Sequence, residues 1–513
     1  MSNVRILWAD DEIDLLRSQI KYLSDKGYDV IEVTNATDAL EKCADEPLDI
    51  VFLDENMPGL SGLDALQRIK QINPQLPVVM ITKNEEENLM EEAIGSQITD
   101  YLIKPVKPQQ ILLTLKKIMD NKRLVKAKTD STYQQEFQKI FMAFQEKLSP
   151  QEWSDLYRKL VYWELTLERS GTQMSDVFDL QKEEANREFS KFVSANYLKW
   201  LRGDSAPTMS HTLMAEKVLP HIGDGPVMMV LVDNLRFDQW KAIEPLVAEH
   251  FRVISEEVYY SILPTATQYS RNAIFAGMHP LEIEKRFPKQ WRNDEEEGGK
   301  NMFENEFLTD LMVRNKVKGK YTYQKILNLE EGQRFQDEVH NYLSFEFSAI
   351  VYNFVDMLSH ARTDMQVLKE LANDEAAYRS LTLSWFEHSP LFAALKRIAD
   401  KKVKLIITTD HGSVRVKTPS KVVGDRNTTT NLRYKTGKNL SYDKRDVLEV
   451  KNPHDAFLPK QHVSSSFIFV RDDKYFVYPN NYSYYAGFYK NTFQHGGISL
   501  EEMLIPLVVL TSK

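Results

Sequence analysis

The chain has 513 residues, of which 42% are hydrophobic and 27% are charged, and these proportions are ordinary for a globular protein. Its formal net charge of -9 argues against a protein that coats nucleic acid, and its single cysteine excludes a disulfide framework within the chain. We find no apolar run of about 18 residues and no signal-peptide core, so we expect no membrane insertion and a cytoplasmic, reducing location. The length predicts about three domains.

The first segment, residues 1–120, alternates strand-like and helix-like patterns. Five strands are expected, with helices between them: Val4–Ala9, Tyr28–Val33, Ile50–Leu53, Val78–Ile81 and Thr99–Ile103. This alternation predicts a parallel sheet with right-handed crossovers. Three carboxylates follow the strands, those of Asp10, Asp11 and Asp54. Such a cluster needs a hard cation such as Mg²⁺ to offset its mutual repulsion.

This segment resembles the receiver domain of two-component response regulators over nearly its full length. The resemblance implies phosphorylation of Asp54 by a sensor histidine kinase. The magnesium ligands that it implies are Asp10, Asp11, Asp54 and Asn56. The residues that it implies for reading the phosphoryl group are Thr82, Tyr101, Lys104 and Pro105, the last after a cis peptide bond. Lys83 stands where a small residue is usual, and we expect it to narrow access to the site.

Between residues 121 and 205 the strand patterns stop, and apolar and aromatic residues recur three and four positions apart. Three helices are expected: Tyr133–Leu148, Pro150–Ser170 and Met174–Trp200. We interpret this segment as a helical bundle that carries the state of the receiver to the rest of the chain. The basic residues over 107–128 indicate a solvated face of the receiver's last helix, and a dimer or partner face is the alternative.

The third segment, residues 206–513, places polar side chains where short β-branched runs end. Asp233 follows Val227–Val232, Asp356 follows the run that begins at Ser348, and Asp410 and His411 follow the run that begins at Lys404. Ligands collect where strands end in open α/β sheets, so these side chains are expected to converge. His360 stands one helical turn after Asp356, a spacing that lets a carboxylate and an imidazole hold one ion.

Thr267 lies at the centre of the stretch SILPTATQYSRNAIFAG, residues 261–277. A threonine hydroxyl becomes an effective nucleophile when a metal lowers its pKa. The P-T-x-T and G-x-x-P spacing and the order of the ligand residues resemble the nucleotide pyrophosphatase/phosphodiesterase branch of the alkaline phosphatase superfamily. The resemblance implies that Thr267 is the nucleophile and bridges two zinc ions. One zinc would be held by Asp356, His360 and His495. The other would be held by Asp233, Asp410 and His411.

Residues 283–340 interrupt the alternating pattern, and we expect a cap inserted over the site. A polar stretch over 414–446, which resembles the PglZ branch of the superfamily, leaves the strand end that carries two ligands. A solvated loop and a role in binding substrate anions are both open for it. The candidate anion-binding residues are Arg271, Arg426, Arg433 and Lys435, and for Arg271 a surface salt bridge is the alternative. A hairpin is expected over Phe467–Val470 and Lys474–Val477.

The order of receiver, helical linker and PglZ-type domain resembles the PorX response regulators associated with type IX protein secretion. We therefore expect an α/β protein with a flavodoxin-like receiver, a central α-helical bundle and an alkaline-phosphatase-like domain. The resemblance implies a zinc-dependent phosphodiesterase that acts on nucleotides or short or cyclic oligonucleotides, with homodimers forming on phosphorylation. It also implies a sigma factor and a secretion-motor component as partners. A phosphomonoesterase and a catalytically silent, zinc-stabilised adaptor are the alternatives, although a structural zinc needs no threonine.

Overall fold

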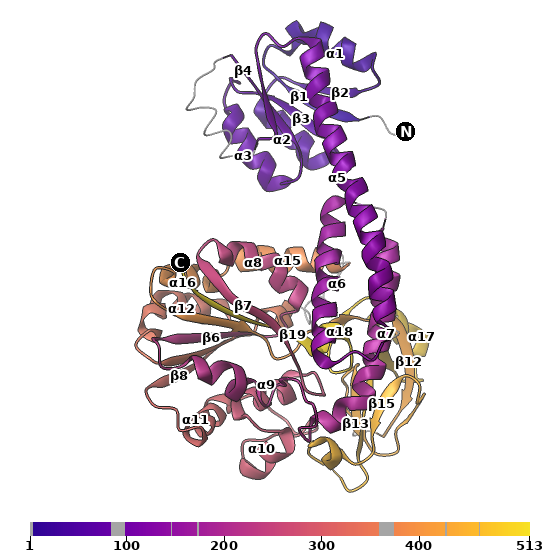
Figure 1. Cartoon of the computed structure of the whole chain (residues 1–513), viewed down its shortest axis with the longest axis vertical. Helices are drawn as coiled ribbons and strands as arrows, with labels where there is room; N and C mark the ends of the chain where they lie inside the picture. The colour runs from indigo at the N-terminus through magenta and orange to yellow at the C-terminus, as the bar shows by residue number, and fades with distance from the viewer. Residues whose placement is uncertain are drawn as a thin grey trace. The chain divides into compact units, whose positions relative to one another are not determined.

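A computed structural model describes residues 4–83, 98–144, 146–171, 174–358, 374–425, 428–460 and 462–513, without the side chains of 120–125. The chain divides into two compact units, Met1–Ser131 and Thr132–Lys513, and each is described by itself (Figure 1). None of the helices in the described ranges combines the length and the hydropathy that a bilayer-spanning segment needs.

The first unit is built on a five-stranded parallel sheet with the order β2-β1-β3-β4-β5. The strands are β1 (Arg5–Ala9), β2 (Asp29–Val33), β3 (Ile50–Asp54), β4 (Val78–Thr82) and β5 (Asp100–Ile103). The helices among the described residues are α1 (Arg17–Ser24), α2 (Ala36–Asp45), α3 (Gly62–Ile72) and the first part of α5 (Pro108–Ala143), with a 3-10 turn at Ile13–Leu16. The expected flavodoxin-like receiver fold is confirmed.

The central strands of this sheet are apolar on both faces because helices cover both. Along β1, Ile6 and Trp8 join the core on one side of the sheet, while Leu7 and Ala9 join the core on the other. Successive side chains of a strand point to opposite faces, so each strand supplies both cores. The polar residue that ends β3, Asp54, therefore stands at the carboxyl edge of a sheet whose central strands are buried.

Helix α5 is longer than the sequence predicted. A separate bundle helix was expected to begin at Tyr133, but α5 runs without a break for 36 residues. The prediction of two helices was wrong because no glycine or proline interrupts the stretch from residue 109 to residue 143. Two further helices follow, α6 (Pro150–Ser170) and α7 (Ser175–Trp200). Helix α6 begins where predicted, since Ser149 and Glu152 form a capping box and Pro150 occupies the first turn.

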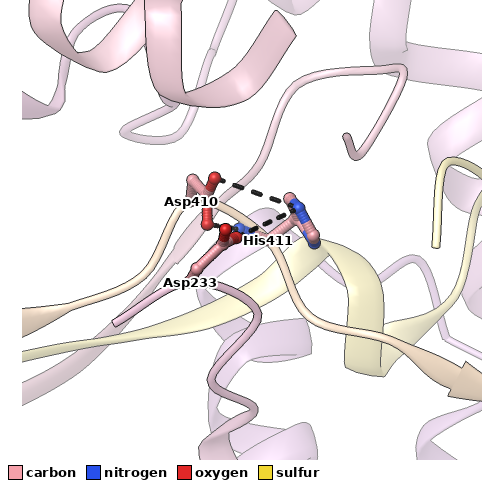
Figure 2. Close-up of side chains that lie close together, drawn as sticks. All are labelled: Asp233, Asp410 and His411. Carbon is pink, nitrogen blue, oxygen red and sulfur yellow. Dashed lines mark hydrogen bonds and ion pairs between the residues drawn. The ribbon is translucent and has the colours of Figure 1, made fainter. Parts of the chain in front are cut away.

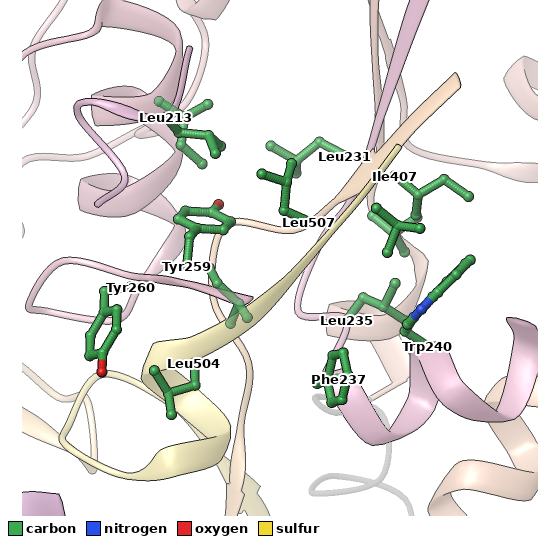
Figure 3. Packing of buried hydrophobic residues seen from close by; sticks show 14 of the residues in the cluster. Leu213, Leu231, Leu235, Phe237, Trp240, Tyr259, Tyr260, Ile407, Leu504 and Leu507 are labelled. Atoms are coloured by element: carbon green, nitrogen blue, oxygen red, sulfur yellow. The ribbon is translucent and has the colours of Figure 1, made fainter. Parts of the chain in front are cut away.

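The second unit contains a six-stranded sheet with the order β7-β19-β10-β6-β9-β8. Its strands are β6 (Val227–Val232), β7 (Phe251–Tyr260), β8 (Tyr321–Ile326), β9 (Phe347–Tyr352), β10 (Lys404–Thr408) and β19 (Leu504–Ser512). Strands β10, β6, β9 and β8 are parallel, and β19 runs antiparallel to β10 and β7. Figure 3 shows how Leu231, Ile407 and Leu507 of three neighbouring strands pack in one buried cluster.

Helices cover both faces of this sheet (Figure 1). One face carries α8 (Phe237–Ala248), α12 (Leu329–Tyr342), α15 (Glu375–His388) and α16 (Pro390–Ile398). The other face carries α9 (Thr267–Ala276) and α11 (Glu304–Arg314), with α10 (Pro280–Arg286) between them in the chain. The predicted alkaline-phosphatase-like α/β layering is present, and it places the carboxyl ends of β6, β9 and β10 at one edge.

The segment that was expected to form a cap, residues 283–340, is only partly separate from the main sheet. Strand β8 pairs in parallel with β9, and α12 packs against α16, so the second half of the segment belongs to the core layers. The cap prediction is wrong for that half. The reason is that β8 is an edge strand with the sequence YTYQKI, whose mostly half-exposed residues lack the apolar pattern of a buried strand.

The polar stretch over 414–446 is not one loop. It contributes β11 (Val414–Arg415), β12 (Thr418–Val423), β13 (Tyr434–Gly437) and β14 (Ser441–Tyr442) to small sheets with later strands. Those later strands are β15 (Val447–Val450), β16 (Ser466–Val470), β17 (Lys474–Val477) and β18 (Phe493–Gln494), and helix α17 (Tyr482–Tyr489) follows β17. The hairpin prediction was wrong: β16 lies between β13 and β15, so both of its edges are occupied, and β17 pairs with β12 instead.

Candidate functional site

The candidate site lies at the carboxyl edge of the six-stranded sheet. Asp233 follows β6 directly, and Asp410 and His411 follow β10 after one residue. Strands β6 and β10 are parallel neighbours in which Leu231 pairs with Thr408, so the residues after them emerge side by side. Thr267 is the first residue of α9. Local strand patterns and parallel pairing therefore bring together residues that are far apart in the sequence.

Asp233, Asp410 and His411 form a fully buried cluster whose potential ligand atoms all lie within 4.8 Å of one another (Figure 2). The Nε2 atom of His411 is 3.7 Å from Oδ1 of Asp233 and 3.9 Å from Oδ2 of Asp410. The hydroxyl of Thr267 is 3.0 Å from Nε2 of His411 and 3.5 Å from Oδ1 of Asp233. The predicted nucleophile, Thr267, thus lies within contact distance of two members of one predicted ligand set, Asp233 and His411.

Arg271 lies against the two carboxylates of this cluster. Its Nε is 3.0 Å from Oδ2 of Asp410, its Nη2 pairs with Oδ2 of Asp233, and its Nη1 donates to Oδ1 of Asn353 at 3.0 Å. The guanidinium has no exposed surface. Burying two carboxylates is costly unless an opposite charge compensates them. Arg271 is therefore a buried counter-charge, and the predictions of a substrate contact or a surface salt bridge do not describe it.

The same burial shifts the protonation of the cluster. Burial raises the pKa of Asp233 to about 7, and the Arg271 guanidinium opposes that rise. Burial lowers the pKa of His411, which favours the neutral imidazole. Nδ1 of His411 is 3.1 Å from the carbonyl oxygen of Gly412, so this nitrogen carries the proton and donates it. The lone pair of Nε2 is then directed at Thr267 and Asp233.

The second predicted ligand set adjoins the first. Nε2 of His495 lies 3.6 Å from Oδ1 of Asp356, and its Nδ1 is 3.1 Å from the carbonyl oxygen of Thr265. The rings of His411 and His495 are stacked, with 4.3 Å between their centroids. The remaining member of this set, His360, lies outside the described residues. All the other predicted zinc ligands are brought to one edge of the sheet.

The donors of this edge fit zinc. Imidazole nitrogen and carboxylate oxygen are the ligands that zinc accepts besides thiolate, and catalytic zinc sites commonly hold three protein ligands. Asp233 and His411 present Oδ1 and Nε2 to the space beside Thr267, while the Oδ2 atoms of both aspartates face Arg271. The hydrogen bonds of both histidines at Nδ1 leave Nε2 as the nitrogen that would bind a metal ion.

Two of the remaining predicted anion-binding residues are buried away from any substrate. Nε and Nη2 of Arg433 lie 3.1 and 2.6 Å from the carboxylate of Glu502. Lys435 is 1% exposed, donates to the carbonyl oxygen of Thr429 at 2.7 Å, and has its pKa lowered to about 7 by burial. Both predictions are wrong, because Arg433, directly before β13, and Lys435, within β13, are buried. Arg426 lies outside the described residues.

Sequence reasoning missed two asparagines at the site. Asn234 has a positive φ of 62° and donates through its side chain to Oδ1 of Asp356 at 3.3 Å, so it ties the ends of β6 and β9. Asn301 donates to the carbonyl oxygen of Thr267 at 3.0 Å and holds the start of α9. An asparagine directly after a strand-ending aspartate was a signal for the first, since asparagine tolerates left-handed backbone. Nothing local indicated the second.

The receiver unit has its own acidic cluster. Potential ligand atoms of Asp10, Asp11 and Asp54 lie within 4.8 Å of one another. Nζ of Lys104 is 2.9 Å from a carboxylate oxygen of Asp10 and of Asp54. Burial raises the pKa of Asp54, and Lys104 opposes the rise. Oxygen ligands without nitrogen or sulfur fit the predicted Mg²⁺.

The other predicted receiver residues differ in burial and in their partners. The hydroxyl of Thr82 donates to Glu55 at 2.5 Å, and Asn56 and Tyr101 are exposed. The peptide bond between Lys104 and Pro105 is cis, as predicted. Lys83 pairs with Glu12 at 3.0 Å, in a contact that joins the loop after β4 to the loop after β1.

Three family descriptions match successive parts of the chain. Residues 6–116 match the response regulator receiver domain, residues 123–201 match the PorX response regulator linker domain, and residues 213–510 match the BREX system PglZ alkaline phosphatase-like domain. The last of these covers more than half of the 513 residues.

Relatives of known name match the receiver part. The chain is 32% identical over 116 residues to the chemotaxis protein CheY of Thermotoga maritima, covering 96% of that protein and 22% of this chain. It is 33% identical over 129 residues to the transcriptional regulatory protein ZraR of Klebsiella oxytoca, covering 25% of this chain but only 29% of that regulator. A receiver domain of solved structure from Clostridium thermocellum is 29% identical, with a TM-score of 0.23 and coverage of 24% of this chain and 98% of that one. The chain therefore belongs to the PglZ alkaline-phosphatase-like family, and its succession of receiver, linker and PglZ domain makes it a PorX-type response regulator.

Proposed function

We propose that this response regulator is a zinc-dependent phosphodiesterase whose nucleophile is Thr267. The observation that carries the proposal is the position of the Thr267 hydroxyl, 3.0 Å from Nε2 of His411 in a buried cluster with Asp233 and Asp410. A hydrolase in general is supported by the membership of the alkaline-phosphatase-like family. A cluster that only stabilised the fold would have no use for a hydroxyl facing its ligand atoms.

The residues of this chain would supply the nucleophile, Thr267, and would orient the phosphate group of the substrate. Thr267 opens α9, and the dipole of this helix favours negative charge at that end. The Thr267 oxygen would attack phosphorus, the bond to the leaving alcohol would break, and water would later hydrolyse the phosphothreonine. Two zinc ions, held by Asp233, Asp410 and His411 and by Asp356, His360 and His495, would lower the pKa of the hydroxyl and offset the phosphate charge.

Nucleotides or short or cyclic oligonucleotides are the proposed substrates, because a threonine nucleophile and a diesterase-like spacing both favour diesters. A phosphomonoester is the second choice. The buried cations Arg271, Arg433 and Lys435 leave substrate selection to other groups, since none of the three is accessible.

The proposed setting is two-component signalling in type IX secretion. A sensor histidine kinase would phosphorylate Asp54 with Mg²⁺ at Asp10, Asp11 and Asn56, and the phosphorylated chain would form homodimers in the cytoplasm. A sigma factor and a secretion-motor component are the proposed partners. An increase in molar mass on adding a phosphoryl mimic, measured by light scattering, would support dimerisation, and an unchanged mass would refute it.

The decisive experiment compares wild type with Thr267→Val and with Thr309→Val, which removes an exposed threonine hydroxyl of α11. Hydrolysis of bis-para-nitrophenyl phosphate and of the mono-ester is measured, with zinc determined on the same samples. We expect two zinc ions per chain in all three proteins and diester turnover in wild type and Thr309→Val. In Thr267→Val we expect turnover to fall about 10³-fold or more, the scale of losing a catalytic nucleophile.

Three outcomes would contradict the proposal in whole or in part. Diester turnover that Thr267→Val leaves unchanged would remove the catalytic assignment of the threonine. Bound zinc without turnover of either ester would favour the alternative of a silent, zinc-stabilised adaptor. Preference for the mono-ester would retain the nucleophile but favour a phosphomonoesterase.

A further inference from the structure

Helix α7 belongs to the linker by family match, yet its side chains bond to the turns that carry the candidate site. The linker match ends at residue 201 and the PglZ match begins at residue 213, while residues 132–513 form one compact unit. Four polar residues of α7 face that part of the unit, namely Lys182, Asn186, Ser190 and Tyr197. Their spacing of four, four and seven residues places them on one face of the helix.

The first turn held by α7 follows His495. Oδ1 of Asn186 accepts from the backbone N–H of Leu500 at 2.7 Å, and its Nδ2 donates to Glu501 at 3.1 Å. Nζ of Lys182 lies 3.2 Å from the same carboxylate. The hydroxyl of Ser190 donates to the carbonyl oxygen of Ile498 at 3.3 Å. These contacts hold the amino-terminal end of helix α18 (Leu500–Met503), which lies beside α7 in Figure 1.

The second turn lies upstream of Thr267. The hydroxyl of Tyr197, a residue 1% exposed, accepts from the backbone N–H of Leu263 at 2.7 Å. Thr265, two residues on, accepts through its hydroxyl from the N–H of Gly496 at 2.9 Å and donates to the carbonyl oxygen of Gly497 at 3.0 Å. The loop before Thr267, residues 261–266, and the turn after His495, residues 496–500, are therefore hydrogen-bonded to each other. Each of the two is also hydrogen-bonded to α7.

The third turn, which carries His411, reaches α7 through α18. The N–H of Gly412 donates to the carbonyl oxygen of Glu502 at 3.2 Å. A Cβ atom at Gly412 would lie 2.1 Å from the carbonyl oxygen of Glu501, so the two segments are in direct backbone contact. A shift of α18 would therefore act directly on the residue after His411.

We infer that Lys182, Asn186 and Tyr197 of α7 are positioning residues that hold the turns of Thr267, His411 and His495 in one arrangement. The linker helix is in this sense a part of the output site, and a displacement of α7 changes the geometry of the metal ligands. The inference rests on the proposed function for its metal, but the positioning of the three turns does not depend on a bound ion.

The test uses two variants of the full chain with matched controls. Asn186→Asp keeps an acceptor for Leu500 but sets a carboxylate against Glu501, and Tyr197→Phe removes the acceptor of the Leu263 N–H. Asn196→Asp changes an asparagine of the same helix whose side chain donates to Phe192 within it. Tyr162→Phe changes a tyrosine of α6 that is 61% exposed.

Three readouts are taken: zinc affinity by chelator competition, the visible spectrum of the Co²⁺-substituted protein, and amide exchange of residues 261–268 and 493–503 without metal. We expect Asn186→Asp and Tyr197→Phe to lose about 10–100-fold in zinc affinity, the range seen when partners that orient ligands are removed. We also expect an altered Co²⁺ spectrum and faster exchange of both segments, with the two controls like wild type.

The outcomes separate this inference from the proposed function. Exchange, affinity and spectrum that match wild type in both variants would overturn the positioning role, even if wild type is an active zinc enzyme. A wild type that binds no metal would refute the proposed function, and the exchange of the metal-free variants would still decide the positioning of the turns. Faster exchange that Asn196→Asp and Tyr162→Phe reproduce would also overturn it, because the effect would not be specific.

Discussion

The two units of this chain contain acidic clusters built in the same way. In each, carboxylates gather at the carboxyl ends of parallel strands, and one cation lies among them. In the receiver unit Lys104 bridges Asp10 and Asp54, and its side chain is 13% exposed. In the output unit Arg271 bridges Asp233 and Asp410, and its side chain has no exposed surface.

The difference between the clusters is one of access and ligand type. The receiver cluster has oxygen ligands, one of them on the exposed Asp11, and its lysine is a flexible point charge. Such a site suits a hydrated, exchangeable Mg²⁺ and an incoming phosphoryl group. The output cluster is closed, includes the imidazole of His411, and has a planar guanidinium that contacts both carboxylates. That arrangement offers the nitrogen and oxygen ligands that zinc accepts.

The largest effect should come from removing the buried cation of the output cluster. Arg271→Met leaves Asp233 and Asp410 buried without their counter-charge, which we expect to lower the free energy of unfolding by about 3–5 kcal/mol in the presence of a chelator. Zinc should recover part of this loss, because it replaces the missing positive charge. The loss in the free energy of unfolding is measured by denaturant unfolding and by amide exchange of β6 and β10. The control Arg286→Met breaks an exposed pair with Asp310, and a similar loss there would contradict the comparison.

The equivalent change in the receiver should cost less. Lys104→Met also separates a cation from two carboxylates, but this site is partly open and water can reach Asp11. We expect a loss of about 1–3 kcal/mol, the scale of leaving a charged hydrogen-bonding group without its partner. Millimolar Mg²⁺ should reduce the loss. Amide exchange of β1 and β3 in the full chain reports on it, and a loss as large as that of Arg271→Met would show that access does not distinguish the clusters.

Both clusters could be located from the sequence because their carboxylates follow strands with strong local signals. Six consecutive apolar residues precede Asp233 and four precede Asp54, and the polar residue after each run marks the end of the strand. Parallel pairing then dictates that the ends meet. The same reasoning predicted His411, whereas Thr267 and His495 were assigned through the resemblance to the alkaline phosphatase superfamily.

What could not be predicted depends on contacts between distant segments. The role of Arg271 is set by Asp233 and Asp410, which lie far from it in the sequence, so no local pattern distinguishes it from a substrate contact. The burial of Arg433 likewise depends on Glu502. Strand β8 was missed because an edge strand can be polar, and the hairpin of β16 and β17 failed because two other strands occupy the edges of β16.

A third prediction concerns a lysine that lacks the carboxylate partners of Lys104. Burial lowers the pKa of Lys435 to about 7, whereas its unfolded value is about 10.4. Between pH 7 and 9 the unfolded chain therefore binds more protons than the folded chain, so stability should rise with pH. Lys435→Met should flatten this rise by up to about 1.4 kcal/mol per pH unit. Unfolding free energies measured across that range test it.

Lys421→Met, a change of an exposed lysine of β12, controls for the loss of one positive charge. Stability curves of wild type and Lys435→Met that stay parallel from pH 7 to pH 9 would show that Lys435 is protonated in the folded chain. Asp10 and Asp54 raise the pKa of Lys104 against the effect of burial, whereas burial lowers the pKa of Lys435. Parallel curves would mean that the two lysines do not differ in this way.

The smallest effect on stability should come from the ion pair at the mouth of the receiver cluster. Lys83 and Glu12 are about half exposed, so Lys83→Ala should change the free energy of unfolding by less than about 1 kcal/mol. Its effect on access should be measurable, because the pair joins the loops on either side of Asp54. We expect faster phosphorylation of Asp54 by acetyl phosphate, followed by the mass of the intact protein. Lys117→Ala breaks an exposed pair with Asp100 on the same unit and should leave the rate unchanged. Equal phosphorylation rates in Lys83→Ala and Lys117→Ala would mean that Lys83 does not restrict the access of acetyl phosphate to Asp54.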